Sequence, residues 1–231
     1  MKLKIKSNTL TRHLLIASIS VVLTVVFWMA HFEWDDEMRL WRAFGDAGYS
    51  MLFVTLIIGP ISKLWTRGAF LLTWRREVGI WFAILAVTHG LLIAHGWANW
   101  DAAKFFGYEF IPQLGRMARM EPGFGLANTL GFVAFLWIAI LALTSSNRAM
   151  KWLGASSWNW IHTGSHLVFY LVAIHTAYFL FMHYTESFHH TVPPQSTFVI
   201  PFVVMSIMVL GLQIAAFIKV ARTKKDRLVQ E

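Results

Sequence analysis

The stretch that decides the fold runs from Trp158 to Tyr184 and reads W-N-W-I-H-T-G-S-H-L-V-F-Y-L-V-A-I-H-T-A-Y-F-L-F-M-H-Y. It is long and apolar enough to cross a bilayer as a helix, yet it contains His162, His166, His175 and His183. Ionisable side chains at hydrocarbon depth usually face a bundle interior and serve a pathway or a cofactor, and neutral imidazole is a common ligand of iron. A histidine that only hydrogen-bonds to another helix is the simpler alternative.

The composition of the whole chain is that of a membrane protein. Of its 231 residues, 57% are hydrophobic and 16% aromatic, and none is cysteine. We therefore expect an all-α integral membrane protein with no separate soluble domain. The lack of cysteine excludes disulfides, cysteine-bound iron–sulfur clusters and covalent c-type haem in this chain, so any haem is held non-covalently.

Six apolar runs are long enough to span a membrane, which predicts a six-helix bundle. They cover about residues 14–32, 45–64, 77–97, 124–144, 158–184 and 198–220. Residues 98–123 are mixed in charge and contain two prolines. We expect an extracytoplasmic loop with a short interfacial helix there.

Basic residues lie beside alternate ends of these runs and set the predicted topology. The formal charge is +8, but the lysines and arginines flank apolar segments as the positive-inside rule requires, which argues against nucleic-acid binding. We expect a cytoplasmic segment over residues 1–13, a membrane domain over 14–220 and a basic cytoplasmic tail over 221–231. Both termini then lie in the cytoplasm, and the chain is a multi-pass protein of a bacterial inner membrane.

In this topology the third and fifth runs both lead outward, so their histidines can be compared by depth. His89 follows Arg76 by 13 residues, or roughly 20 Å of helix. Opposed imidazoles on the two helices, one of them His175, are suited to both axial positions of a b-type haem. Either His89 or His95 is a candidate to face His175.

The other histidines of the fifth run lie nearer the inner surface. His162 precedes His175 by 13 residues, roughly 20 Å, and His166 is one turn further along from His162. A second haem at that depth lacks an obvious partner on the third helix. The sequence favours one haem over two.

A double arginine, Arg75-Arg76, precedes the third run. It is explained either as a topology marker or as a partner for haem propionates or a flavin phosphate, to which guanidinium groups are well suited. No Gly-rich dinucleotide fingerprint occurs in the chain. A separate reductase or a membrane quinol must therefore supply electrons to a haem in this protein.

Four local patterns resemble the ferric reductase-like transmembrane superfamily. They are L-I-I-G-P-I-S-K-L, W-R-R-E-V-G-I-W-F-A-I-L-A-V-T-H, L-A-L-T-S-S-N-R-A-M-K-W-L-G-A-S-S-W-N-W-I-H and Y-L-V-A-I-H. The resemblance covers about residues 45–184. Within the superfamily it is greatest to the haem-binding membrane subunits of periplasmic methionine sulfoxide reductase systems.

This resemblance implies that His89, His162 and His175 are haem-ligating positions. It also implies b-type haem, FMN or a flavin reductase as donor on the cytoplasmic side, and a periplasmic molybdopterin enzyme as acceptor. That enzyme, and not this chain, reduces oxidised methionine, so the chain is an electron-transfer subunit of an oxidoreductase. The extra histidines His95, His166 and His183 depart from the family pattern. An alternative alignment on Y-L-V-A-I puts His166 in the position given above to His162.

Two alternatives stay open. A ferric or cupric reductase would give electrons directly to a metal outside, docked on Glu186, His189 and His190, although a solvated loop is the simpler explanation of these residues. A cofactor-free transporter or assembly factor would use its histidines for proton relay. A colourless purified protein would favour the second alternative.

Overall fold

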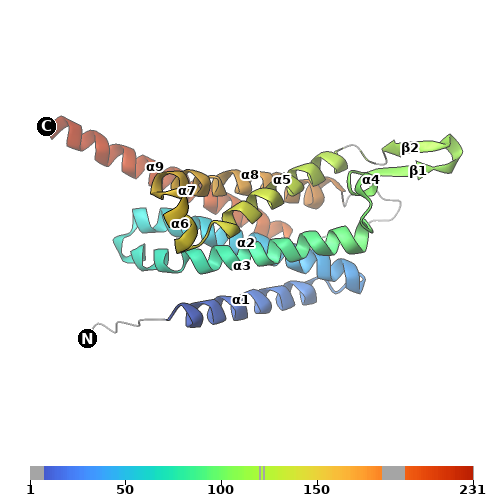
Figure 1. Ribbon diagram of the computed structural model, residues 1–231, viewed down its shortest axis with the longest axis horizontal. Helices are drawn as coiled ribbons and strands as arrows, with labels where there is room; N and C mark the ends of the chain where they lie inside the picture. The colour runs from blue at the N-terminus through green and yellow to red at the C-terminus, as the bar shows by residue number, and fades with distance from the viewer. Residues whose placement is uncertain (1–7, 120, 122, 184–195, 231) are drawn as a thin grey trace.

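The computed structural model describes residues 8–119, 121, 123–183 and 196–230 as a bundle of long helices lying side by side (Figure 1). Its described part contains six helical segments that are long and apolar enough to cross a membrane, which confirms the six-span, all-α prediction. The segments are α1 (Thr9–Ala30), α2 (Asp36–Leu64), α3 (Arg75–Leu92) with a π-helical turn (Ile93–Trp97), α5 (Phe124–Leu143), α7 (Ala155–Thr163) joined to α8 (Ser165–Tyr178) and a π-helical turn (Phe179–His183), and α9 (Val199–Gln230).

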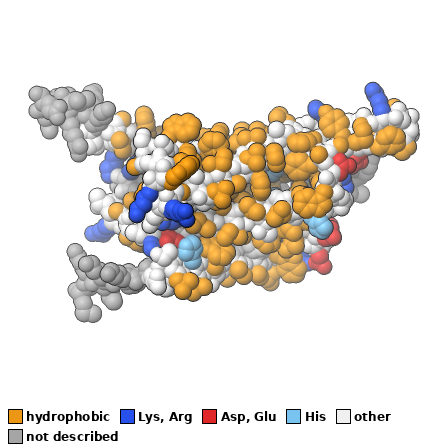
Figure 2. All heavy atoms as spheres, viewed as in Figure 1, with side chains coloured by type: hydrophobic (Ala, Val, Ile, Leu, Met, Phe, Trp, Pro, Cys, Tyr) orange, Lys and Arg blue, Asp and Glu red, His pale blue; other side chains and the backbone are white. Residues whose placement is uncertain are grey.

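Helix α2 occupies the centre of the bundle and packs against α1, α3 and α9, while α5 packs against α8 and α3. The core between them includes Leu52 and Leu56 of α2, Val168 of α8 and Val209 of α9, all almost fully buried. Large apolar side chains on the outside of the bundle are exposed, as expected for a surface that faces lipid. Figure 2 shows this hydrophobic surface between the two ends of the bundle.

Helix α2 begins nine residues earlier than the apolar run from residue 45. The Asp35 carboxylate accepts a hydrogen bond from the Met38 backbone N–H at 2.9 Å, and so caps the helix. Asp36 and Glu37 occupy the first turn, where negative charge is favourable. The acidic segment that hydropathy assigns to a loop is therefore in part the first turn of α2.

Two short elements connect spans at the end that carries most lysines and arginines. A 3₁₀ segment (Thr66–Thr73) joins α2 to α3, and α6 (Asn147–Leu153) joins α5 to α7. Gly164, at the α7–α8 junction, allows a close helix contact, because a Cβ there would lie 2.1 Å from Nε1 of Trp137 on α5. Basic side chains gather at this end in Figure 2.

At the opposite end, the segment between α3 and α5 contains α4 (Ala102–Phe105), which is the short helix expected there. A hairpin of β1 (Tyr108–Ile111) and β2 (Arg116–Arg119), joined by a 3₁₀ turn (Pro112–Leu114), was not expected. The strands pair antiparallel, with Phe110 opposite Met117. Gly115 has a positive φ of 58° and completes the turn, a conformation that favours glycine. The hairpin extends beyond the helix ends (Figure 1).

Candidate functional site

His89 on α3 is held by the backbone of α2. Its Nδ1 lies 2.9 Å from the carbonyl oxygen of Trp41. Because a carbonyl oxygen only accepts hydrogen bonds, Nδ1 carries the proton and Nε2 carries a lone pair. Nε2 has no hydrogen-bond partner among the residues that the structure describes.

His175 on α8 is held in the same way by α5. Its Nδ1 lies 2.8 Å from the carbonyl oxygen of Ala127, so its Nε2 is also the unprotonated nitrogen. No described residue hydrogen-bonds this Nε2 either. Histidines that ligate metals characteristically donate the second ring N–H to a carbonyl or carboxylate, which fixes the tautomer and the ring orientation.

A glycine makes room for each ring. A Cβ added to Gly45 would lie 3.2 Å from Cε1 of His89 and 3.3 Å from its Nδ1. A Cβ added to Gly131 would lie 2.8 Å from Nδ1 of His175 and 2.9 Å from its Cε1. Each glycine is four residues after the residue whose carbonyl holds the ring, so one helical turn supplies both the acceptor and the space.

The two arrangements are copies of each other along the chain. His175 follows His89 by 175 − 89 = 86 residues, Ala127 follows Trp41 by 127 − 41 = 86, and Gly131 follows Gly45 by 131 − 45 = 86. The pairs α2–α3 and α5–α8 therefore present one imidazole each by the same local geometry. His89 also contributes to the electrostatic environment of His175.

Three buried hydrogen-bond donors on α3, α5 and α8 lack a partner among the described residues. They are Nε1 of Trp81 on α3, Nε1 of Trp137 on α5 and Oγ of Ser165 on α8. A buried donor without an acceptor is costly, and it is a place where a bound group is expected to supply the missing acceptor.

These observations fit a b-type haem. Two neutral imidazoles with free Nε2 atoms, presented by two helices inside a membrane bundle, form a donor set suited to a non-covalent haem iron. His89 and His175 would hold the iron. The unpartnered N–H and O–H groups are suited to the polar edge of such a group.

The remaining predicted histidines are placed differently. His95 is exposed in the π-helical turn after α3, and its ring lies 6.2 Å from the Trp100 ring, centroid to centroid. No backbone carbonyl of a described residue holds this ring, so the geometry favours His89 over His95 as the partner of His175. His166 Nδ1 lies 3.2 Å from the Gln213 side-chain amide nitrogen on α9.

His162 lies toward the basic end of the bundle. It stacks on Trp158 with 3.9 Å between ring centroids, and its Nε2 lies 3.1 Å from the Thr144 hydroxyl. Arg75 and Arg76 both act on it electrostatically. These three predicted residues therefore all lie toward the basic end of the bundle, whereas His89 and His175 are held further along the helices by the Trp41 and Ala127 carbonyls.

The two arginines differ in their partners. Arg76 donates from Nη2 to Oδ1 of Asn147 at 2.7 Å. Arg75 is half-buried at the start of α3 and has no hydrogen bond to a described side chain or carbonyl. Arg75 is the better placed of the two to receive an anionic group.

A buried hydrogen bond between a histidine and an aspartate, on the hairpin side, was not found by sequence reasoning. Nε2 of His31 lies 2.7 Å from Oδ2 of Asp46, the residue after Gly45. His31 is 2% exposed, and Asp46 acts electrostatically on His89. An aspartate inside the second apolar run was the available signal.

Aromatic rings lead from His175 toward the same end. His175 contacts Phe179, which contacts Phe124, which contacts Trp97, with centroid separations of 5.0, 5.7 and 5.0 Å. Nearby, the Glu121 carboxylate accepts hydrogen bonds from the Tyr178 hydroxyl and the His183 ring.

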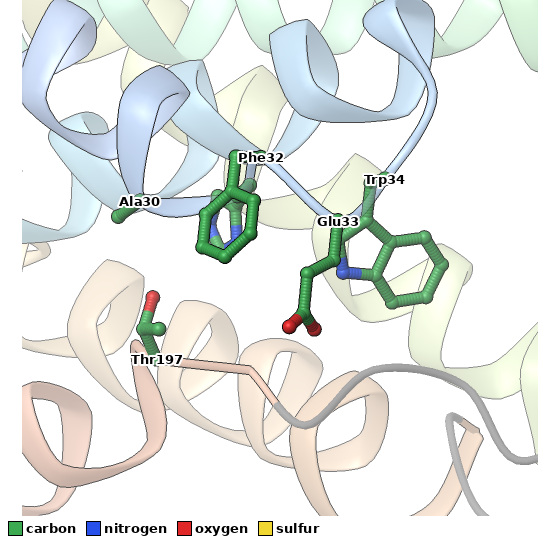
Figure 3. A pocket seen from close by; sticks show the side chains of 6 residues that line it. Ala30, Phe32, Glu33, Trp34 and Thr197 are labelled. Atoms are coloured by element: carbon green, nitrogen blue, oxygen red, sulfur yellow. The ribbon is translucent and has the colours of Figure 1, made fainter.

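A surface pocket lies outside this site. It has a volume of about 240 Å³ and is lined by the last residue of α1, Ala30, by residues 31–34 of the following loop and by Thr197 (Figure 3). Phe32 and Glu33 stand in it, and no predicted haem ligand lines it. The predicted metal-docking residues Glu186, His189 and His190 lie outside the described residues. Within the described part, no group of three or more histidines and carboxylates is arranged to hold a metal ion.

The chain is similar in sequence to haem-binding membrane subunits, which confirms the predicted resemblance. It is 27% identical over 154 residues to the protein-methionine-sulfoxide reductase haem-binding subunit MsrQ of Polaromonas naphthalenivorans, covering 64% of each protein. It is 29% identical over 154 residues to MsrQ of Azospira oryzae, covering 63% of this chain and 59% of that subunit. The matches thus span less than two thirds of the relatives' own length.

A second kind of relative is the magnetosome protein MamZ of Magnetospirillum gryphiswaldense. The chain is 29% identical to it over 136 residues, which cover 58% of this chain and 18% of MamZ. No protein-family model matches the chain.

Proposed function

We propose that this protein is a transmembrane electron-transfer subunit that holds b-type haem between His89 and His175 and passes electrons across a bacterial inner membrane. The observation that carries the proposal is the repeated arrangement in which a backbone carbonyl fixes Nδ1, a glycine admits the ring and Nε2 stays free. The haem would supply an iron that cycles between the ferric and ferrous states. The chain's own residues hold, orient and enclose it.

The direction of transfer rests on the charge at the two ends. Lys63, Arg67, Arg75, Arg148 and Lys219 lie at one end of the spans, which the positive-inside rule assigns to the cytoplasm. A soluble flavin reductase, or FMN held by Arg75 and Arg76 near His162, would deliver electrons there. A membrane quinol is the alternative donor.

The acceptor lies on the other side in this orientation. The similarity to MsrQ supports a periplasmic molybdopterin methionine sulfoxide reductase in that role. In this arrangement the chain carries electrons, and the partner enzyme reduces the substrate.

Haem content tests the ligand assignment. His89→Ala and His175→Ala should each lower the haem-to-protein ratio and change the Soret band of the purified protein. His95→Ala is the matched control, because this exposed histidine lies on the same helical segment as His89, and the variant should resemble the wild type. Unchanged spectra for both His89→Ala and His175→Ala would refute the site.

Electron transfer tests the function. Proteoliposomes that enclose NADH and a flavin reductase should reduce the haem, and external molybdopterin reductase with methionine sulfoxide should reoxidise it. A reduced haem that this enzyme does not oxidise, but that ferric citrate does, would favour the metal-reductase alternative.

A further inference from the structure

One face of the hairpin is apolar and exposed. Directly paired residues of an antiparallel ladder lie on the same face, which here joins Tyr108 and Phe110 of β1 with Met117 and Arg119 of β2. Phe110 is 60% exposed and Met117 46%. Arg119 lies over the Tyr108 ring at 5.5 Å and donates to its hydroxyl at 3.2 Å, so the guanidinium borders the apolar patch.

The position of the hairpin separates this patch from the lipid-facing surface. The strands continue along the long axis of the bundle past the ends of α5 and α8 (Figure 1), and Figure 2 shows basic and hydrophobic side chains together on this projecting part. Since the spans cross the bilayer along that axis, the hairpin points away from it. Exposed apolar patches away from lipid mark interaction sites, and a lone two-stranded hairpin is only marginally stable in water.

Charge indicates what covers the patch. Arg119 borders the patch, whereas Arg116 and Glu109 lie on the other face of the hairpin. External loops are normally poor in arginine, so topology does not explain Arg119 at this position. A carboxylate on a partner is its complement.

Helix α4, which precedes the hairpin, is joined to the turn of α5 that holds His175. The Asn128 side-chain amide donates to the Phe105 carbonyl at 2.7 Å, and Asn128 follows Ala127, whose carbonyl holds the His175 ring. Gly107, with a φ of +79°, lies against Phe124, where a Cβ would be 3.1 Å from the ring. The base of the hairpin therefore lies next to Phe124, one of the rings in the contacts that lead to His175.

We infer that the face formed by Tyr108, Phe110, Met117 and Arg119 is the docking surface for the soluble electron acceptor, a protein that presents an apolar patch bordered by carboxylates. The inference rests on the proposed function, since it assigns where the periplasmic enzyme binds. Apolar contact would hold the complex, and Arg119 would favour a partner with a carboxylate at the edge of the patch.

Reoxidation kinetics test the surface. Full-length haem-loaded protein, reduced with dithionite, is mixed in a stopped-flow instrument with the purified periplasmic molybdopterin methionine sulfoxide reductase of the same organism, or with ferricyanide. Phe110→Asp combined with Met117→Asp should slow oxidation by the enzyme roughly tenfold or more, as for truncation of interface anchor residues. Oxidation by ferricyanide should change less than about twofold, because the haem site is unaltered.

Two controls separate the surface from hairpin folding. Phe110→Leu with Met117→Leu keeps the patch apolar and should retain the wild-type rate, and Ala118→Ser alters only the opposite face of the hairpin. Equal enzyme rates for wild type and the double aspartate variant would overturn the docking surface alone. A wild-type protein that ferricyanide oxidises and the enzyme does not would overturn the proposed acceptor, and the docking inference with it.

A spin label tests the competing occupant, the bilayer. The chain has no cysteine, so Met117→Cys provides a single labelling site. In lipid nanodiscs the label should collide with a water-soluble nickel chelate and lose mobility when the enzyme is added. Preferential collision with oxygen, as for a lipid-embedded label, would show that the face lies in the membrane and would overturn the inference.

Discussion

Gly131→Ala should displace His175 and weaken haem binding. A Cβ at this position would lie 2.8 Å from Nδ1, whereas ordinary contacts begin at 3.4 Å, so the ring must move by 3.4 − 2.8, about 0.6 Å. That movement strains the 2.8 Å hydrogen bond to the Ala127 carbonyl. Loss of such an outer hydrogen bond typically lowers metal affinity about 10–100-fold.

Helix propensity predicts the opposite result for Gly131→Ala. Alanine is favoured over glycine inside a helix by about 1 kcal/mol, so the substitution alone would stabilise α5. Gly45→Ala is the graded comparison, since its Cβ would be 3.2 Å from the His89 ring and needs a shift of only about 0.2 Å. Gly211→Ala on α9 is the matched control, because nothing lies within 4 Å of its Cβ position.

Titration of haem into purified apoprotein, followed at the Soret band, measures the affinity of each variant. We expect Gly211→Ala to bind haem as tightly as the wild type, Gly45→Ala to bind it more weakly, and Gly131→Ala to bind it most weakly. A Gly131→Ala protein that binds haem as tightly as the wild type would show that the close contact with His175 has no role, and would refute the reasoning.

Three further substitutions test the surroundings of the site. Asp46→Asn removes a negative charge that acts on His89. Because the carboxylate stabilises the ferric form, the substitution should raise the haem midpoint potential by tens of millivolts in a redox titration. An unchanged potential would contradict this expectation. Arg12→Ala leaves the buried carboxylate of Glu77 without the guanidinium that lies 3.5 Å away. The substitution should lower the free energy of unfolding by about 3 kcal/mol, which is measured as a lower Tm. Adding Glu77→Gln to the same protein should partly restore the Tm. Gly164→Ala places a Cβ 2.1 Å from the Trp137 ring nitrogen and should cost about 1–3 kcal/mol in thermal unfolding, with Gly59→Ala, whose Cβ position is open, as the control.

The spans were predictable because bilayer thickness fixes their length and hydropathy reports it directly. All six predicted runs coincide with helices in the described part of the chain. The early start of α2 escaped this reasoning, because the Asp35 cap extends the helix through charged residues. The hairpin escaped it as well, since strands of four residues give little periodicity, although Gly115 was a turn signal.

For the candidate site, sequence reasoning identified the histidines but not how they are held. Distance along the helix places His89 and His175 at comparable depths, yet it does not distinguish His89 from His95. The choice follows from the Trp41 carbonyl and from Gly45, which belong to a different helix. Such contacts depend on helix packing. What the sequence contains of them is the 86-residue spacing between the two glycines and between the two histidines.

The central claim, that His89 and His175 share one haem iron, is tested most directly by low-temperature electron paramagnetic resonance of the ferric haem-loaded protein. The wild type and His95→Ala should give the low-spin signal of an iron with two imidazole ligands, and both His89→Ala and His175→Ala should lose it. Persistence of that signal in either of the last two variants would contradict the account.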